Sequence, residues 1–238
     1  MRRRDPSAVG RAITAAQRGG KAYRRPVGKP RALRVGFTGP PGAGKSSLLR
    51  EVMKRLRSQG DAAALVACDP VSPVTGGSFL GDRCRFAGLS EDPGLFIRSV
   101  AHRSPPGELP PEALKAADVL EAAGFPWVFI ETVGSGQAEV DGLRGTDLRV
   151  LVHPPDAGDG MQMLKAGAIE TADLHAVNKC DRPGAAVLAR ELRIALGTVA
   201  GEAGAPVFEV SALTGQGVDA LVAELRMRRD TPGKERLP

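Results

Sequence analysis

The sequence predicts an α/β fold in which a doubly wound, mostly parallel sheet carries helices on both faces. Short apolar runs typical of strands alternate along the chain with helical patterns, and this alternation indicates parallel strands joined by crossover helices. Hydrophobic residues make up 42% of the chain but aromatic ones only 4%, so the core must consist mainly of Ala, Val, Leu and Ile. The length of 238 residues suits one such domain with short tails.

Each element follows from its local pattern. We expect strands over 33–38, 63–68, 95–100, 127–131, 148–153, 174–178 and 207–210. We expect helices over 45–58, 111–123, 185–200 and 217–227; prolines stand at the start of the second, where a first helical turn tolerates them. A short helix over 7–18 is predicted before the first strand, with Ser7 as its N-cap and one face formed by Ala8, Ala12, Ile13 and Ala16.

Charge and cysteine content limit the possible classes of function. Lysine and arginine number 33 against 27 acidic residues, and much of this excess lies in the first 31 residues. Such a basic segment suits a solvated tail, an acidic partner or nucleic acid, but only Tyr23 interleaves with its arginines, which argues against nucleic acid. The three cysteines form no CxxC pair, which favours a reducing cytoplasm over disulfides or zinc. No apolar run approaches the ~20 residues of a membrane span, so no membrane contact is expected.

A glycine-rich turn follows the first predicted strand and precedes the first long helix. Residues 39–46 read GPPGAGKS, a full match to the P-loop pattern GxxxxGK[ST]. The glycines allow backbone N–H groups to face phosphates, while Lys45 would reach the β- and γ-phosphates and the Ser46 hydroxyl would bind Mg²⁺. The predicted phosphate-binding residues are Gly39, Pro40, Pro41, Gly42, Ala43, Gly44, Lys45, Ser46 and Ser47.

A second motif indicates which base the nucleotide carries. Residues 178–181 read NKCD, the NKxD pattern of GTPases, and they follow a predicted strand. Asp181 would accept hydrogen bonds from the ring N–H and exocyclic amine of guanine, which adenine cannot supply. Asn178 would brace the loop, Lys179 would cover the ring, and the backbone N–H groups of a third segment would meet the guanine carbonyl. That segment is Ser211, Ala212 and Leu213.

Three further strings carry a resemblance to a known family. They read DPVSPVTGGSFLGDR over 69–83, ETVGSGQAE over 131–139 and PDAGDGMQ over 155–162, and RAIT begins at Arg11. With them the chain resembles the MeaB/ArgK/MMAA group of P-loop GTPases, from about residue 11 to about residue 225. The resemblance implies a P-loop NTPase of the SIMIBI type that hydrolyses GTP to GDP and phosphate with Mg²⁺. It also implies a cytoplasmic chaperone for an adenosylcobalamin-dependent acyl-CoA mutase such as methylmalonyl-CoA mutase.

The same strings contain candidate acids for the metal and for a switch. Asp69 and Glu131 follow predicted strands on the phosphate side of the sheet, where a carboxylate can hold Mg²⁺ directly or through water. With Lys45 they form the expected catalytic set. The resemblance implies a metal and switch shell made of Ser46, Asp69, Asp82, Glu131 and Asp159. Gly134 would bring its N–H to the γ-phosphate, and the expected switch also includes Gln137 and Glu139, although Gln137 is not expected to position the attacking water.

The expected organisation is an N-terminal helical and basic extension over 1–32, a P-loop GTPase domain over 33–229 and a C-terminal tail over 230–238. The sequence differs from the family pattern at Ser135 in the switch and at Gly160. It ends before the helical arm that the family uses for dimerisation. A homodimer is therefore possible only through another surface, and the dimer typical of the family is not expected. His102, His153 and His175 are scattered, and we expect His175 in the core. The alternatives are a metallochaperone GTPase for nickel-enzyme maturation and a P-loop kinase or transport-associated ATPase.

Overall fold

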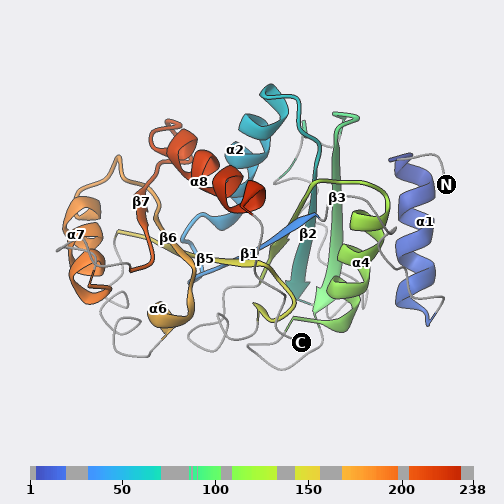
Figure 1. Ribbon diagram of the computed structural model, residues 1–238, viewed down its shortest axis with the longest axis horizontal. Coiled ribbons are helices and arrows are strands. Elements are labelled where there is room, and N and C mark those ends of the chain that lie inside the picture. The colour runs from blue at the N-terminus through green and yellow to red at the C-terminus, as the bar shows by residue number, and fades with distance from the viewer. Residues whose placement is uncertain are drawn as a thin grey trace.

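The computed structural model describes residues 4–19, 32–70, 86, 88, 89, 91–102, 109–132, 143–155, 168–197 and 204–231. Seven strands form one sheet in the order β3-β2-β4-β1-β5-β6-β7, and every pairing is parallel (Figure 1). The strands are β1 (Leu33–Thr38), β2 (Ala63–Pro70), β3 (Leu95–His102), β4 (Trp127–Glu131), β5 (Leu148–His153), β6 (Leu174–Val177) and β7 (Val207–Glu209).

Helices cover both faces of this sheet, as the sequence predicts. Side chains alternate along each strand, so neighbouring residues contribute to different cores. On one face Leu65, Phe37 and Phe129 pack with α2 and α8, and on the other Val66, Val128 and Ile130 pack with α1 and α4. Helix α7 packs beside β6 and β7. The helices are α1 (Pro6–Gln17), α2 (Lys45–Ser58), α4 (Pro111–Ala122), α6 (Ala168–Thr171), α7 (Ala185–Ala195) and α8 (Val218–Asp230).

Several boundaries differ from those expected. Strands β2 and β3 each continue two residues further, while β6 and β7 each end one residue earlier. Helix α7 ends at Ala195 rather than at residue 200, because Gly197 takes a left-handed φ of 69° that closes the helix. Helix α8 continues to Asp230, three residues past its expected end, and an ion pair between Glu224 and Arg228 supports its last turn. None of the helices among the described residues has the length and apolar character needed to cross a membrane.

The N-terminal helix packs against α4 as part of the core (Figure 1). Its N-cap is Asp5, whose carboxylate accepts hydrogen bonds from the backbone of Ser7 and Ala8, so the predicted Ser7 cap was wrong by two residues. Its buried face contains Val9 rather than Ala8. The other buried residues of this face are Ala12, Ile13 and Ala16, as predicted.

A buried ion pair joins the first strand to α4. Arg34 is 6% exposed, and its guanidinium donates to Asp118 at 2.6 Å and to Glu121 at 2.7 Å. Glu121 also accepts a hydrogen bond from the backbone N–H of Ala32, at the start of β1. Removing one partner of such a pair would leave a buried charge, which costs about 3–5 kcal/mol. These contacts hold the strand that leads into the glycine-rich turn.

Candidate nucleotide-binding site

The predicted site residues that the structure describes lie at the carboxyl edge of the parallel sheet. The glycine-rich turn follows β1, Asp69 lies near the end of β2, and Glu131 ends β4. Asn178 directly follows β6, and Ser211 lies just beyond β7. Open α/β sheets bind their ligands in the crevice outside this edge. The topology therefore brings together segments that are separated by more than a hundred residues in the chain.

The conformation of the glycine-rich turn depends on two glycines. Gly39 has a φ of 142°, and a Cβ atom there would lie 2.2 Å from the carbonyl oxygen of Val152 in β5. Gly44 has a φ of 85°, and a Cβ atom there would lie 2.5 Å from the Asn178 amide nitrogen. Helix α2 begins directly afterwards with no side-chain cap on its N-terminus. The turn is therefore held against β5 and β6 with the positive end of α2 facing the site, the usual arrangement for binding phosphate.

Lys45 begins α2, and its ammonium group lies against the turn. The Nζ atom donates to the carbonyl oxygens of Gly39 at 2.7 Å and Pro40 at 3.1 Å, and the residue is only 7% exposed. A buried ammonium needs hydrogen-bond acceptors, and these two carbonyls supply them. A phosphate oxygen brought to this turn would meet a positive charge that is already in place.

Three oxygen-bearing side chains lie at the same edge of the sheet as Lys45, those of Ser46, Glu131 and Asp69. The Ser46 hydroxyl donates to the Glu131 carboxylate at 2.6 Å, which joins α2 to the end of β4. Ala67 is the register partner of Glu131, and Asp69 lies two residues further along β2, so both carboxylates point to the α2 face of the sheet. Asp69 and Glu131 are 5% and 6% exposed. A hydroxyl with two carboxylates is a hard-oxygen set that fits Mg²⁺, which proteins usually hold through one or two carboxylates plus phosphate oxygens.

Asn178 joins the phosphate loop to the two base loops. Its amide nitrogen donates to the carbonyl oxygen of Ala43 at 2.8 Å, and its amide oxygen accepts from the backbone N–H of Ala212 at 3.1 Å. The side chain is 1% exposed, so both contacts are shielded from water. Lys179 adds another contact with the phosphate loop, from its Nζ to the Gly42 carbonyl at 2.7 Å.

Asp181 accepts a short hydrogen bond from the Ser211 hydroxyl. This bond lowers the pKa of the Asp181 carboxyl below its usual value, so the group is ionised at neutral pH. The carboxylate itself is exposed at the surface of the site. It is therefore a negatively charged acceptor, held in place by Ser211, that a guanine edge can approach.

The backbone of the segment from Ser211 to Leu213 makes hydrogen bonds within the protein. The Ser211 N–H donates to the carbonyl of Gln216, and the Ala212 N–H donates to Asn178, so both groups already have partners within the protein. Leu213 is 86% exposed. In this structure both groups therefore close the turn, and their role as backbone donors to the guanine carbonyl stays a prediction. In this structure the two residues position Asp181 and Asn178.

A buried histidine pair lies beside the base loops, and the sequence does not indicate it. His153 ends β5 and His175 lies in β6, with 3.0 Å between His153 Nε2 and His175 Nδ1. His175 Nε2 lies 3.1 Å from the Ile169 carbonyl, which can only accept, so His175 carries its proton on Nε2. His175 Nδ1 must then accept from His153 Nε2–H. Burial lowers the pKa of His153 to about 3 and that of His175 to about 4, and the expectation of a core His175 is confirmed.

We expect this pair to make the folded state sensitive to acid. Both histidines titrate near 6.5 when unfolded, so the unfolded state takes up protons that the folded state excludes. The contribution of the pair to the free energy of unfolding is therefore present in full above pH 6.5, and it is lost as the pH falls towards 4. From pH 7 to pH 5.5 the pair should cost about 2 kcal/mol of unfolding free energy. Urea unfolding at pH 7 and pH 5.5 measures this change in unfolding free energy. The His153→Gln/His175→Gln variant should show little of the change, and an equal change in parent and variant would contradict the prediction.

Five predicted residues lie outside the part of the chain that the structure describes. They are the metal candidate Asp82, the γ-phosphate contact Gly134 and the switch residues Gln137, Glu139 and Asp159. Their roles remain predictions from the sequence.

Comparisons with known proteins show the family of this chain. The profile of the family described as "Methylmalonyl Co-A mutase-associated GTPase MeaB" matches residues 24–235. A protein of Pyrococcus abyssi is 40% identical over 97% of this chain and 74% of its own length. The mouse mitochondrial protein named methylmalonic aciduria type A homolog is 41% identical over 66% of this chain, but that match spans only 38% of the mouse protein.

Two solved structures share the fold. A LAO/AO transport system kinase superposes with a TM-score of 0.71 at 24% identity, covering 96% of this chain and 72% of that one. The hydrogenase maturation factor HypB from Archaeoglobus fulgidus superposes with a TM-score of 0.64 at 16% identity, covering 94% of this chain and all of that one. At these identities the two likenesses show the P-loop α/β fold alone. Family membership rests on the profile and on the relatives at 40% identity or more, and by them the chain belongs to the MeaB family of methylmalonyl-CoA mutase-associated GTPases.

Proposed function

We propose that the protein hydrolyses GTP to GDP and phosphate in an Mg²⁺-dependent reaction. Water attacks the γ-phosphorus, the bond from that phosphorus to the β–γ bridging oxygen breaks, and GDP leaves with the electron pair. The observation that carries this proposal is the hydrogen-bonded connection of Asn178 to both the phosphate loop and the Ser211 loop. Through that connection, the residues that would hold phosphate and those that would read guanine form one site.

The side chains have distinct proposed roles. Lys45 moves from its two carbonyl acceptors to the β- and γ-phosphate oxygens, where its charge opposes the negative charge of the transition state. Ser46, Asp69 and Glu131 would hold the metal ion, which when bound would supply positive charge that opposes the negative charge of the transferred phosphate. Asp181 reads the guanine edge. Since none of these roles is that of a dedicated general base, we expect slow intrinsic hydrolysis that a partner accelerates.

We further propose that this GTPase acts as a chaperone for an adenosylcobalamin-dependent acyl-CoA mutase such as methylmalonyl-CoA mutase. The family description and the name of the mouse relative support this role. Loss of the γ-phosphate would change the loops next to the site, and that change would control how the client is held. A nickel-enzyme metallochaperone is the other candidate, but the likeness to HypB supports it only at the level of the fold.

Binding to purified methylmalonyl-CoA mutase tests the client assignment. The dissociation constant would be measured by calorimetry with a non-hydrolysable GTP analogue, with GDP and without nucleotide. We expect roughly a tenfold difference between the GTP-analogue and GDP states, the usual size of coupling between two sites. No binding in any state would refute the chaperone role, while GTP hydrolysis measured on the same preparation would leave the GTPase assignment intact.

A further inference from the structure

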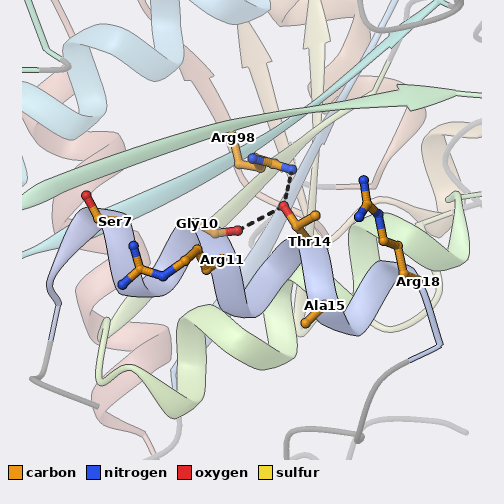
Figure 2. A pocket seen from close by; sticks show the side chains of 7 residues that line it. All are labelled: Ser7, Gly10, Arg11, Thr14, Ala15, Arg18 and Arg98. Atoms are coloured by element: carbon orange, nitrogen blue, oxygen red, sulfur yellow. Dashed lines mark hydrogen bonds between the residues drawn. The ribbon is translucent and has the colours of Figure 1, made fainter.

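A surface groove lies between α1 and the edge of the sheet, away from the nucleotide site. Its volume is about 540 Å³, and its lining residues are Ser7, Gly10, Arg11, Thr14, Ala15, Arg18 and Arg98 (Figure 2). Five of these seven belong to α1, Arg18 is its C-cap residue, and Arg98 comes from β3, the strand at one end of the sheet. Three of the seven are arginines, and none is acidic or aromatic. No role assigned to the nucleotide site uses this groove.

The groove results from the two-sided character of α1. Helix positions three, four and seven residues apart share one face, so Ser7, Arg11, Thr14 and Arg18 follow one line along the outside. The opposite face, with Val9 and Ile13 at its centre, is buried against α4. Gly10 and Ala15 are small, so the floor between the arginines is low enough for another chain to approach it closely.

The three guanidinium groups form a row rather than a single cluster. Arg11 and Arg18 are exposed and lie seven residues apart, which is about 10 Å along a helix that rises 1.5 Å per residue. Arg98 lies between them and donates to the Thr14 hydroxyl at 3.1 Å (Figure 2). It also donates to the Gln17 side-chain oxygen at 3.5 Å. The two hydrogen bonds hold the middle guanidinium in place, while the outer two arginines extend from the helix.

We propose that this arginine groove docks an extended acidic segment of a protein partner. Carboxylates at alternate positions of an extended peptide lie on one side about 7 Å apart, so a few of them cover the row from Arg11 to Arg18. A single phosphate group would need guanidinium groups that converge on one point, and a row spread over about 10 Å does not provide this. Nucleic acid fits less well, because the groove has no aromatic side chain on which a base could stack.

The location of the groove separates docking from nucleotide recognition. Helix α1 lies beyond β3 at one end of the sheet, whereas the base loops follow β6 and β7 at the other end (Figure 1). A segment bound in the groove therefore leaves the exposed Asp181 accessible to GTP. Docking at this groove does not depend on GTP hydrolysis, so the two can be tested independently.

Binding of a short fluorescein-labelled peptide of alternating Glu and Gly tests the proposal, measured by fluorescence anisotropy on the full chain at low salt. We expect the parent to bind this peptide but not its Gln–Gly counterpart. The Arg11→Ala/Arg18→Ala variant should bind the acidic peptide roughly tenfold more weakly, because two charge-assisted contacts are lost. Alanine is the best helix former, so α1 should be retained, and helical content and GTP binding of the variant should match those of the parent.

The matched control is Arg190→Glu, which removes an exposed helical arginine from α7 and lowers the net charge by the same two units. Affinity for the acidic peptide should be preserved in this control. An equal loss in Arg190→Glu would mean general attraction to a basic protein, and unchanged affinity in the double variant would place binding elsewhere; either result overturns the proposal. Tighter binding of single-stranded oligo-dT than of the peptide, lost in the double variant, would also overturn it and assign the groove to nucleic acid.

Discussion

Replacing Asp181 with asparagine is expected to shift the nucleotide preference from GTP to XTP. The carboxylate of Asp181 can accept from both the ring N–H and the exocyclic amine of guanine. An asparagine amide presents one donor and one acceptor, which matches the 2-oxo group and ring N–H of xanthine instead. The amide keeps one acceptor, so one of the two hydrogen bonds to guanine is lost and the other no longer involves a charge. At roughly 1.5–3 kcal/mol for the lost bond, GTP binding should weaken at least about 10- to 100-fold.

The surroundings of Asp181 make this effect large. Ser211 donates to the carboxylate, and its hydrogen bond lowers the pKa of Asp181, so the group is charged at neutral pH. An asparagine oxygen can accept the same bond, and the loop should therefore keep its conformation. Dissociation constants for GTP and XTP, measured by competition with a fluorescent GDP analogue, check the prediction. Asp230→Asn changes an exposed carboxylate at the end of α8 and should leave both constants unchanged; unaltered GTP preference in Asp181→Asn would refute the base-site assignment.

Replacing Lys45 with alanine is expected to reduce the rate of GTP hydrolysis about 100- to 1,000-fold, the usual effect of removing one fixed charge or donor from a transition state. Lys45 is the buried cation of the phosphate loop, and its ammonium is held by the Gly39 and Pro40 carbonyls. After the substitution no ammonium would remain there to oppose charge on the γ-phosphate. Single-turnover hydrolysis at saturating Mg²⁺ and GTP separates this loss from weaker binding.

Lys54→Ala is the matched control for that experiment. Lys54 lies on the same helix nine positions further on, is partly exposed, and pairs with Glu51 at 2.9 Å. Its removal should change stability by less than about 1 kcal/mol and leave hydrolysis unaltered. Hydrolysis by Lys45→Ala at the rate of the parent would contradict the catalytic role of the phosphate loop, provided that the variant keeps the helical content of the parent.

Local patterns were sufficient for much of the fold. The central strands are buried on both faces, so they stand out as apolar runs, and all seven expected strands are present within two residues of their expected ends. Helix ends were harder to place, because a single residue decides them. Asp5 rather than Ser7 caps α1, and Gly197 ends α7 before the apolar pattern does. Capping depends on backbone angles and on which oxygen reaches the free N–H groups, and a sequence offers several candidates for each.

The candidate site divides in the same way. A single short stretch of chain contains the glycine-rich turn with Lys45, and another contains Asn178 and Asp181, so both could be identified from spacing alone. Partners that come from other strands could not. The Ser46–Glu131 bond joins residues 85 apart, and the bond from Asn178 to Ala43 joins residues 135 apart. The same limit applies to the Ser211 and Ala212 backbone, whose N–H groups bond to Gln216 and Asn178, partners that the motif alone does not indicate.

The sequence by itself therefore determined the α/β class, the phosphate loop and the guanine motif, because each depends on neighbouring residues or on the periodicity of one element. Only the tertiary structure decided which segments lie side by side. Strand order placed His153 against His175 and so created a neutral buried pair. Packing of α1 beside β3 placed Arg98 between Arg11 and Arg18 and so created the arginine groove. The physical reason is that hydrophobic periodicity specifies which face of an element is buried, but not which other element will cover it.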